Sequence, residues 1–136
     1  MNLVEKLMKI DAGEFEKKKT EEITSKMLSD ITGEKTRITI QSVDPQRLLE
    51  ISAIALDDEG NPIVEKSLEA NSIVVAEGVI DPSLKDQELI KHLGVATPAM
   101  AALKLFKGEI NVIADRINKL SGFNIDPDKV DKEIKN

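Results

Sequence analysis

The first residues of the chain place apolar side chains at helical spacing. Leu3, Leu7 and Ile10 lie four and three residues apart, which predicts an amphipathic helix of one or two turns. Residues 11–22 are nearly all polar and are expected to form a linker or a solvated segment. The pattern therefore predicts a short helix and a polar linker over residues 1–21, ahead of the main fold.

A different period follows, in which apolar and polar residues alternate. Residues 36–42, TRITIQS, are rich in β-branched side chains, as in a strand with one buried face. Residues 23–28, ITSKML, alternate less cleanly, and Gly33 between the two segments can supply a turn. We therefore expect a β-hairpin within residues 22–43, covered by helices because two strands alone are marginal in water.

Helical spacing returns after the predicted hairpin. Asp44–Pro45 and Thr97–Pro98 each place a capping residue before a proline, which is a frequent start of a helix. The helix after Pro45 carries apolar residues around more than half of its circumference, so it is expected to be central.

The boundaries of the next two segments are less distinct. Residues 63–80 have a seam at helical spacing, although SIVV within them also fits a strand, and their length favours a helix. Ser83 and Asp86 have the spacing of a capping box, which predicts a short helix from this point that ends at Gly94.

A last strong helix is predicted from residue 109 to residue 121. Its seam of Ile110, Ile113, Ile117 and Leu120 has the narrow spacing of a coiled coil, and such a seam is more often a core face than a partner site.

These elements predict an α+β fold, mostly helical, with an N-terminal β-hairpin packed on a bundle of short helices. We expect a single domain over residues 1–123, in which residues 44–123 form the helical part. Residues 124–136 are charged and are expected to be a disordered tail or to hold one helical turn.

Composition restricts the kinds of partner. The chain has 40% hydrophobic, 32% charged and 2% aromatic residues, a net charge of −6 and no cysteine. The basic run Lys17–Lys19 is flanked by glutamates, so the chain lacks the basic surface of a nucleic-acid-binding protein. No apolar run approaches the roughly 20 residues that span a bilayer, and no signal peptide is evident. We expect a soluble, cytoplasmic protein.

No residue set has the pattern of a catalytic or metal site. The single histidine, His92, has Glu88 one helical turn away, which supplies too few groups for catalysis or metal binding. The acidic residues 57–59 and 126–128 lack the spacing of a calcium loop. Serine-nucleophile and phosphate-loop motifs are also absent from the sequence. We therefore expect no enzyme activity, no cofactor and no metal.

Three segments of the chain resemble a known family. The three segments are ITIQSVDPQRLLEI, EGVIDPSLKDQELIKHLGV and TPAMAALKLFKGEINVIADRINKLSGF. They are similar to the XkdN-like tail assembly chaperones of bacteriophages and prophages, and together they span most of residues 22–123. The resemblance implies a small, mostly helical α+β protein. It also implies that the protein binds the tape measure protein and keeps it soluble until the tail tube polymerises.

The resemblance further implies that a longer, frameshifted product can exist, whose extension engages the tail tube protein. Whether the terminal KEIKN marks such a junction is not decided by the protein sequence. Two alternatives to the chaperone role stay open: a structural component retained in the particle, and a small adaptor of unrelated function. An enzyme around His92 is the third and weakest alternative.

The candidate partner surface combines the last two strong helices. An acidic protein with an aliphatic surface can cover the apolar stripes of a helical partner. The residues that we expect in this surface are Met100, Leu103, Phe106, Ile110, Val112, Ile113 and Ile117. Self-association and the oligomeric state stay open.

Overall fold

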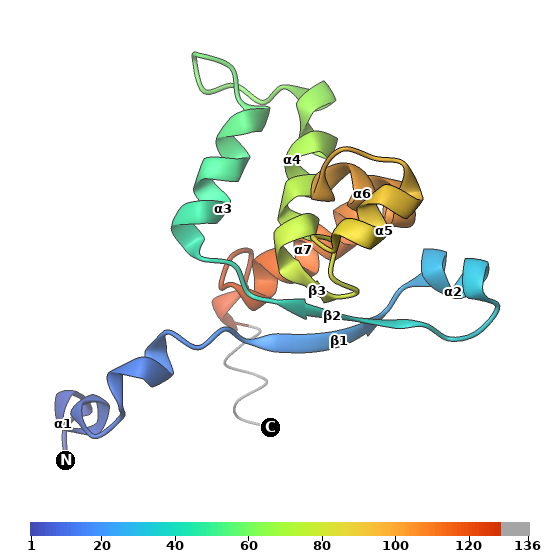
Figure 1. Cartoon of the computed structure of the whole chain (residues 1–136). Helices are drawn as coiled ribbons and strands as arrows, with labels where there is room; N and C mark the ends of the chain where they lie inside the picture. Colours follow the sequence, from blue (N-terminus) through green and yellow to red (C-terminus); the bar gives the residue numbers. More distant parts are fainter. Residues whose placement is uncertain (129–136) are drawn as a thin grey trace.

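The computed structural model describes residues 1–128 of the chain (Figure 1). The prediction for the charged tail concerns residues 124–136, so most of it lies outside the described residues. The elements are, in order, α1 (Leu3–Met8), η1 (Ala12–Phe15), β1 (Thr20–Thr24), α2 (Lys26–Thr32), β2 (Arg37–Gln41), α3 (Pro45–Ser52), η2 (Ala53–Ala55), α4 (Val64–Gly78), β3 (Val79–Asp81), α5 (Gln87–Leu93), α6 (Pro98–Phe106), η3 (Lys107–Glu109) and α7 (Ile110–Leu120), where η denotes a short 3₁₀ helix.

The strands form one antiparallel sheet in the order β1-β2-β3, and the predicted α+β class is confirmed. Ile38 and Ile40 of β2 are fully buried, because they face the helices that cover one side of the sheet. Ile23 of β1 lies opposite Ile38 in the register. The alternation in TRITIQS therefore identified the central strand and its buried face.

The segment between β1 and β2 differs from the predicted hairpin turn. The chain leaves the sheet after Thr24, and Ser25 caps the helix α2 by accepting a hydrogen bond from the Leu28 backbone N–H at 3.1 Å. Gly33 ends this helix in the left-handed conformation (φ 81°). Of the strand predicted over residues 23–28, only Ile23 and Thr24 lie in β1, so the prediction was wrong from Ser25 onward.

The central helix is α4, which packs against α3, α6 and α7. The prediction that the helix after Pro45 is central was wrong. In α3, Leu48 and Ile51 are buried, whereas Leu49 is exposed, so this helix covers the core with one face. Figure 1 shows α3 beside α4, at the edge of the group of helices. Its apolar residues spread widely around the helix because surface helices also carry exposed leucines.

Two predictions for residues 63–93 are refined by the structure. The ambiguous segment is helical, as its length indicated, but the chain passes directly from Gly78 into the short strand β3. Asp86, and not Ser83, is the N-cap of α5, because the Asp86 carboxylate accepts a hydrogen bond from the Leu89 N–H at 3.0 Å. Gly94 ends α5 as predicted.

An ion pair fixes α3 against α4. Nε of Arg47 donates hydrogen bonds to both carboxylate oxygens of Glu77, each at 3.0 Å. The hydrogen bond and the charge of Glu77 raise the pKa of Arg47 above its usual range.

Candidate partner-binding surface

The structure divides the seven predicted partner residues into two groups. Phe106, Ile110, Ile113 and Ile117 are at most 1% exposed, because α6 and α7 turn these side chains into the core against α4. A partner cannot reach them in this fold. The coiled-coil spacing of the isoleucine seam thus corresponds to an internal helix contact.

The other three residues are accessible. Met100 and Leu103 lie one turn apart on α6 and are 48% and 38% exposed. Val112 on α7 is 64% exposed, but it does not line the hollow described next. Met100 and Leu103 are therefore the two predicted residues that the structure brings together at an accessible place.

Met100 and Leu103 form one wall of a groove of about 270 Å³ between α6 and α4. Leu68 on α4, which is 40% exposed, faces them across this hollow. The groove is lined by Glu65, Leu68, Glu69, Ser72, Ala99, Met100 and Leu103. We call it the α4–α6 groove.

The α4 wall of the groove is acidic. The groove residues of α4 share one face of the helix, because Leu68, Glu69 and Ser72 follow Glu65 by three, four and seven residues. Neither glutamate forms a salt bridge within residues 1–128. The apolar surface of the groove thus has two unneutralised carboxylates beside it.

Leu68 belongs to the helical seam predicted over residues 63–80, and it is not among the residues predicted for the partner surface. Its position four residues before the buried Ser72 favours the core, but the Leu68 side chain is 40% exposed. The presence of Glu65 and Glu69 on the same face was the available indication that this face reaches solvent.

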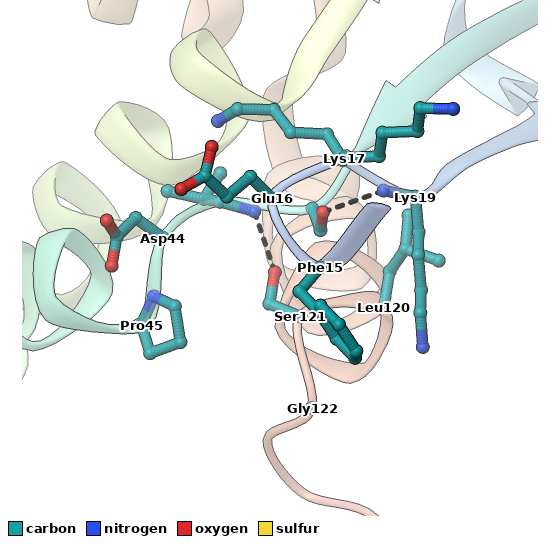
Figure 2. Close-up of a pocket in the computed structure, with 12 residues that line it drawn as sticks. Phe15, Glu16, Lys17, Lys19, Asp44, Pro45, Leu120, Ser121 and Gly122 are labelled. Atoms are coloured by element: carbon teal, nitrogen blue, oxygen red, sulfur yellow. Dashed lines mark hydrogen bonds between the residues drawn. The ribbon is translucent and has the colours of Figure 1, made fainter. Parts of the chain in front are cut away.

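A second hollow, of about 410 Å³, lies where the N-terminal segment joins the sheet (Figure 2). Its walls include Phe15, the lysines 17–19 and Leu120. The Lys19 N–H donates to Ser42 Oγ at 3.0 Å, and this bond attaches the segment to the domain. Figure 2 shows the Phe15 ring beside Ser121 at the C-terminal end of α7, with the Lys17 side chain directed away from it.

The polar residues considered for catalysis do not form a site. His92 is exposed in the last turn of α5. Within residues 1–128, no three His, Cys, Asp or Glu side chains lie close enough together to hold a metal ion. In the same part of the chain, no single helix has the length and apolar composition to cross a membrane; α5 taken with α6 and α7 does, but that pair is bent by 57°.

A family comparison bears on the function of this fold. The model of the phage XkdN-like tail assembly chaperone protein family matches residues 4–135, nearly the whole chain. The chain belongs to this family. It is a family of phage assembly chaperones and not a known enzyme family. The resemblance found in the sequence is confirmed.

A solved structure has the same fold as this chaperone. The crystal structure of the protein yqbn superposes with a TM-score of 0.55, at 14% sequence identity, over 77% of this chain and 87% of the other. At this identity the likeness concerns the fold alone. No curated protein matches the chaperone.

Proposed function

We propose that this chaperone binds an amphipathic helical segment of the tape measure protein in the α4–α6 groove. Bound chaperone keeps the tape measure protein soluble in the host cytoplasm until the tail tube polymerises around it. The observation that supports this proposal is the groove itself, in which Leu68, Met100 and Leu103 expose apolar surface beside the carboxylates of Glu65 and Glu69.

The shape of the groove suits a helix better than a small molecule. Two helices form its walls, and an apolar helix face can lie in such a groove through side chains spaced three and four residues apart. Its volume of about 270 Å³ is smaller than a typical small-ligand pocket of about 300–1,000 Å³. Met100 adds an adaptable side chain, which favours recognition of several related helix faces.

The charge of the groove predicts the polar residues of its partner. Glu65 and Glu69 lie beside the apolar surface, so a bound helix is expected to carry lysine or arginine next to its apolar stripe. The net charge of −6 adds repulsion between chaperone complexes, which opposes aggregation of a coated partner.

The exposed area also sets the strength of one contact. Covering the exposed parts of three apolar side chains contributes about 1 kcal/mol each, and the partner face contributes a similar amount. Association itself costs an estimated 4 kcal/mol or more, so a single contact is weak. Weak contacts repeated along a long tape measure protein give strong total binding while each chaperone remains displaceable by tube subunits.

Co-expression tests this function directly. The unaltered chaperone should keep tape measure fragments in the soluble fraction and co-purify with them. The double variant Met100→Asp/Leu103→Asp should lose both effects, because it places two charges on the apolar wall. Ile31→Asp is the matched control, since Ile31 is 70% exposed on α2, outside the groove.

Thermal melts of all three proteins must first show that the variants fold. A Met100→Asp/Leu103→Asp protein that folds and still solubilises the fragments would contradict the proposed site. Failure of the unaltered chaperone with every tape measure segment would contradict the proposed partner.

We further propose the tail tube protein as a partner of a longer, frameshifted product. The terminal residues KEIKN lie outside the described part of the chain, so this proposal depends on the family resemblance alone. The nucleotide sequence tests it: a slippery heptamer with an overlapping frame is expected, and the absence of both would remove the proposal.

A further inference from the structure

The residues that line the α4–α6 groove differ in size and in exposure. The two least accessible ones are small: Ser72 on α4 is 3% exposed, and Ala99 at the start of α6 is half-buried and packs against the core. Leu68, Met100 and Leu103 are larger and more accessible. Small residues therefore form the floor of the groove, and large apolar residues form its rim.

The space above this floor has the size of one large side chain. An apolar cavity of about 150 Å³ binds a benzene molecule. The groove of about 270 Å³ thus has room for a leucine, methionine or phenylalanine side chain, including the carbon atoms that join it to a backbone. One side chain of a bound helix can enter this space while its neighbours stay on the rim.

The chemistry of the floor favours an apolar side chain in this space. The Ser72 hydroxyl donates its proton to the Leu68 carbonyl oxygen, one turn earlier in α4, at 2.7 Å. The Ala99 side chain has no polar atom, so the side chains of the floor offer no hydrogen-bond donor to a ligand. A carboxylate placed here would lose its hydration without gaining a donor. It would also be repelled by Glu65 and Glu69, which are the charged residues of the lining.

We propose that Ser72 and Ala99 determine the specificity of the groove by admitting one large apolar side chain, the anchor, from a bound amphipathic helix. A side chain that fills a desolvated pocket commonly supplies most of the binding energy of an interface. Residues three and four positions from the anchor then contact the rim, where lysine or arginine meets Glu65 and Glu69.

This proposal rests on the proposed function, because it names the side chain by which a tape measure helix is recognised. A segment with the right charges but without leucine, methionine or phenylalanine at the anchor position is not bound. Recognition therefore selects particular turns of a long helical partner and not its whole apolar stripe.

Designed peptides test the anchor without the tape measure protein. The probe is an alanine-based helix of about 18 residues. Its central guest position holds alanine, leucine or methionine, with lysine four residues before and three residues after it. These three guests have similar helix propensities, so a difference in affinity reports on the groove. Titration of the ¹⁵N-labelled chaperone should shift amides of α4 and α6, and the leucine and methionine guests should bind about tenfold more tightly than the alanine guest.

A larger residue in the floor should remove this preference. Ala99→Leu fills the hollow, so the leucine guest should bind about tenfold more weakly to this variant, and the alanine guest should change by less than about twofold. Ala96→Leu is the matched control, since Ala96 is exposed and does not line the groove. Thermal melts must show that each variant folds. If Ala99→Leu does not fold, Ala99→Val should show the same change with a smaller loss, about threefold.

Three results would overturn the proposal. The first is equal affinity of the unaltered chaperone for all three guests, and the second is an equal loss of all guests in a folded Ala99→Leu chain. The third is the appearance of the same groove shifts when the chaperone alone is concentrated from about 10 μM to about 1 mM, which would assign the groove to a second copy.

The peptide result is independent of the co-expression result. Guest-dependent peptide binding together with failed co-expression would uphold the anchor and contradict the tape measure protein as its source. Successful co-expression with equal affinity for all guests would uphold the partner and contradict the anchor.

Discussion

Replacing Gly78 by alanine has two effects of opposite sign on the stability of the domain. Gly78 lies in the last turn of α4, where alanine normally stabilises a helix by about 0.5–1 kcal/mol relative to glycine. A Cβ atom at this position would lie 2.8 Å from Cγ1 and 2.9 Å from Cγ2 of Ile117. Contacts below about 3 Å do not occur in relaxed structures, so an atom must move.

Ile117 has little freedom to move. It is fully buried on α7, and a β-branched side chain in a helix is confined almost to one χ1 rotamer. Overpacking of a dense core costs about 1–3 kcal/mol, which exceeds the gain in helix preference. We therefore expect Gly78→Ala to destabilise the domain by about 1–2 kcal/mol, a decrease in Tm of roughly 3–8 °C.

The assay is thermal unfolding followed by circular dichroism, with Gly108→Ala as the control. An added Cβ at Gly108 meets no atom within 4 Å, so this variant should stay within about 0.5 kcal/mol of the unaltered chain. Ile117→Val removes Cδ1, the Ile117 atom nearest to an added Cβ at position 78. The double variant with Gly78→Ala should therefore lose less stability than the sum of the two single changes. A Gly78→Ala protein that is more stable than the unaltered chain would refute the close contact of α4 and α7.

Two further variants test the cap of α2 and the absence of a role for the histidine. Glu109→Ala removes a carboxylate that accepts hydrogen bonds from Ser25 Oγ at 2.6 Å and from the Lys26 N–H at 2.7 Å. We expect the free energy of unfolding to fall by about 1–2 kcal/mol and amide hydrogen exchange in α2 to become faster. Unchanged exchange would contradict this account of the cap. His92→Ala should leave tail assembly unchanged in a plaque or tail-formation assay, because the side chain is exposed and lies outside the groove. A loss of tails from a folded variant would support a chemical role for His92 instead.

Local sequence patterns predicted the elements whose causes are local. The caps at Asp44 and Thr97 hold the starts of α3 and α6, and Gly94 ends α5. Alternation in TRITIQS indicated β2 and its buried side. In each case the residues that determine the structure lie within a few positions of one another.

The errors arose where distant residues decide the structure. Ser25 begins a helix with support from Glu109, which is 84 residues away along the chain. Strand β3 exists because β2 offers a free edge, and its three residues are too few for a periodic pattern. Such contacts leave no trace in local spacing.

The candidate surface was predictable in part for the same reason. Sequence spacing grouped Met100 and Leu103 with an isoleucine seam, and the structure separates them because α7 turns its seam inward. The other wall of the groove comes from α4, about 30 residues earlier in the chain. Its assignment required the packing of α4 against α6, which the sequence alone did not give.

Photo-cross-linking from single positions tests the central claim most directly. A photoreactive residue at position 103, in the groove, should form an adduct with the tape measure protein in cells that produce both proteins. The same residue at position 31, on exposed α2, should not. Adducts of equal yield from both positions, or from position 31 alone, would contradict recognition in the α4–α6 groove.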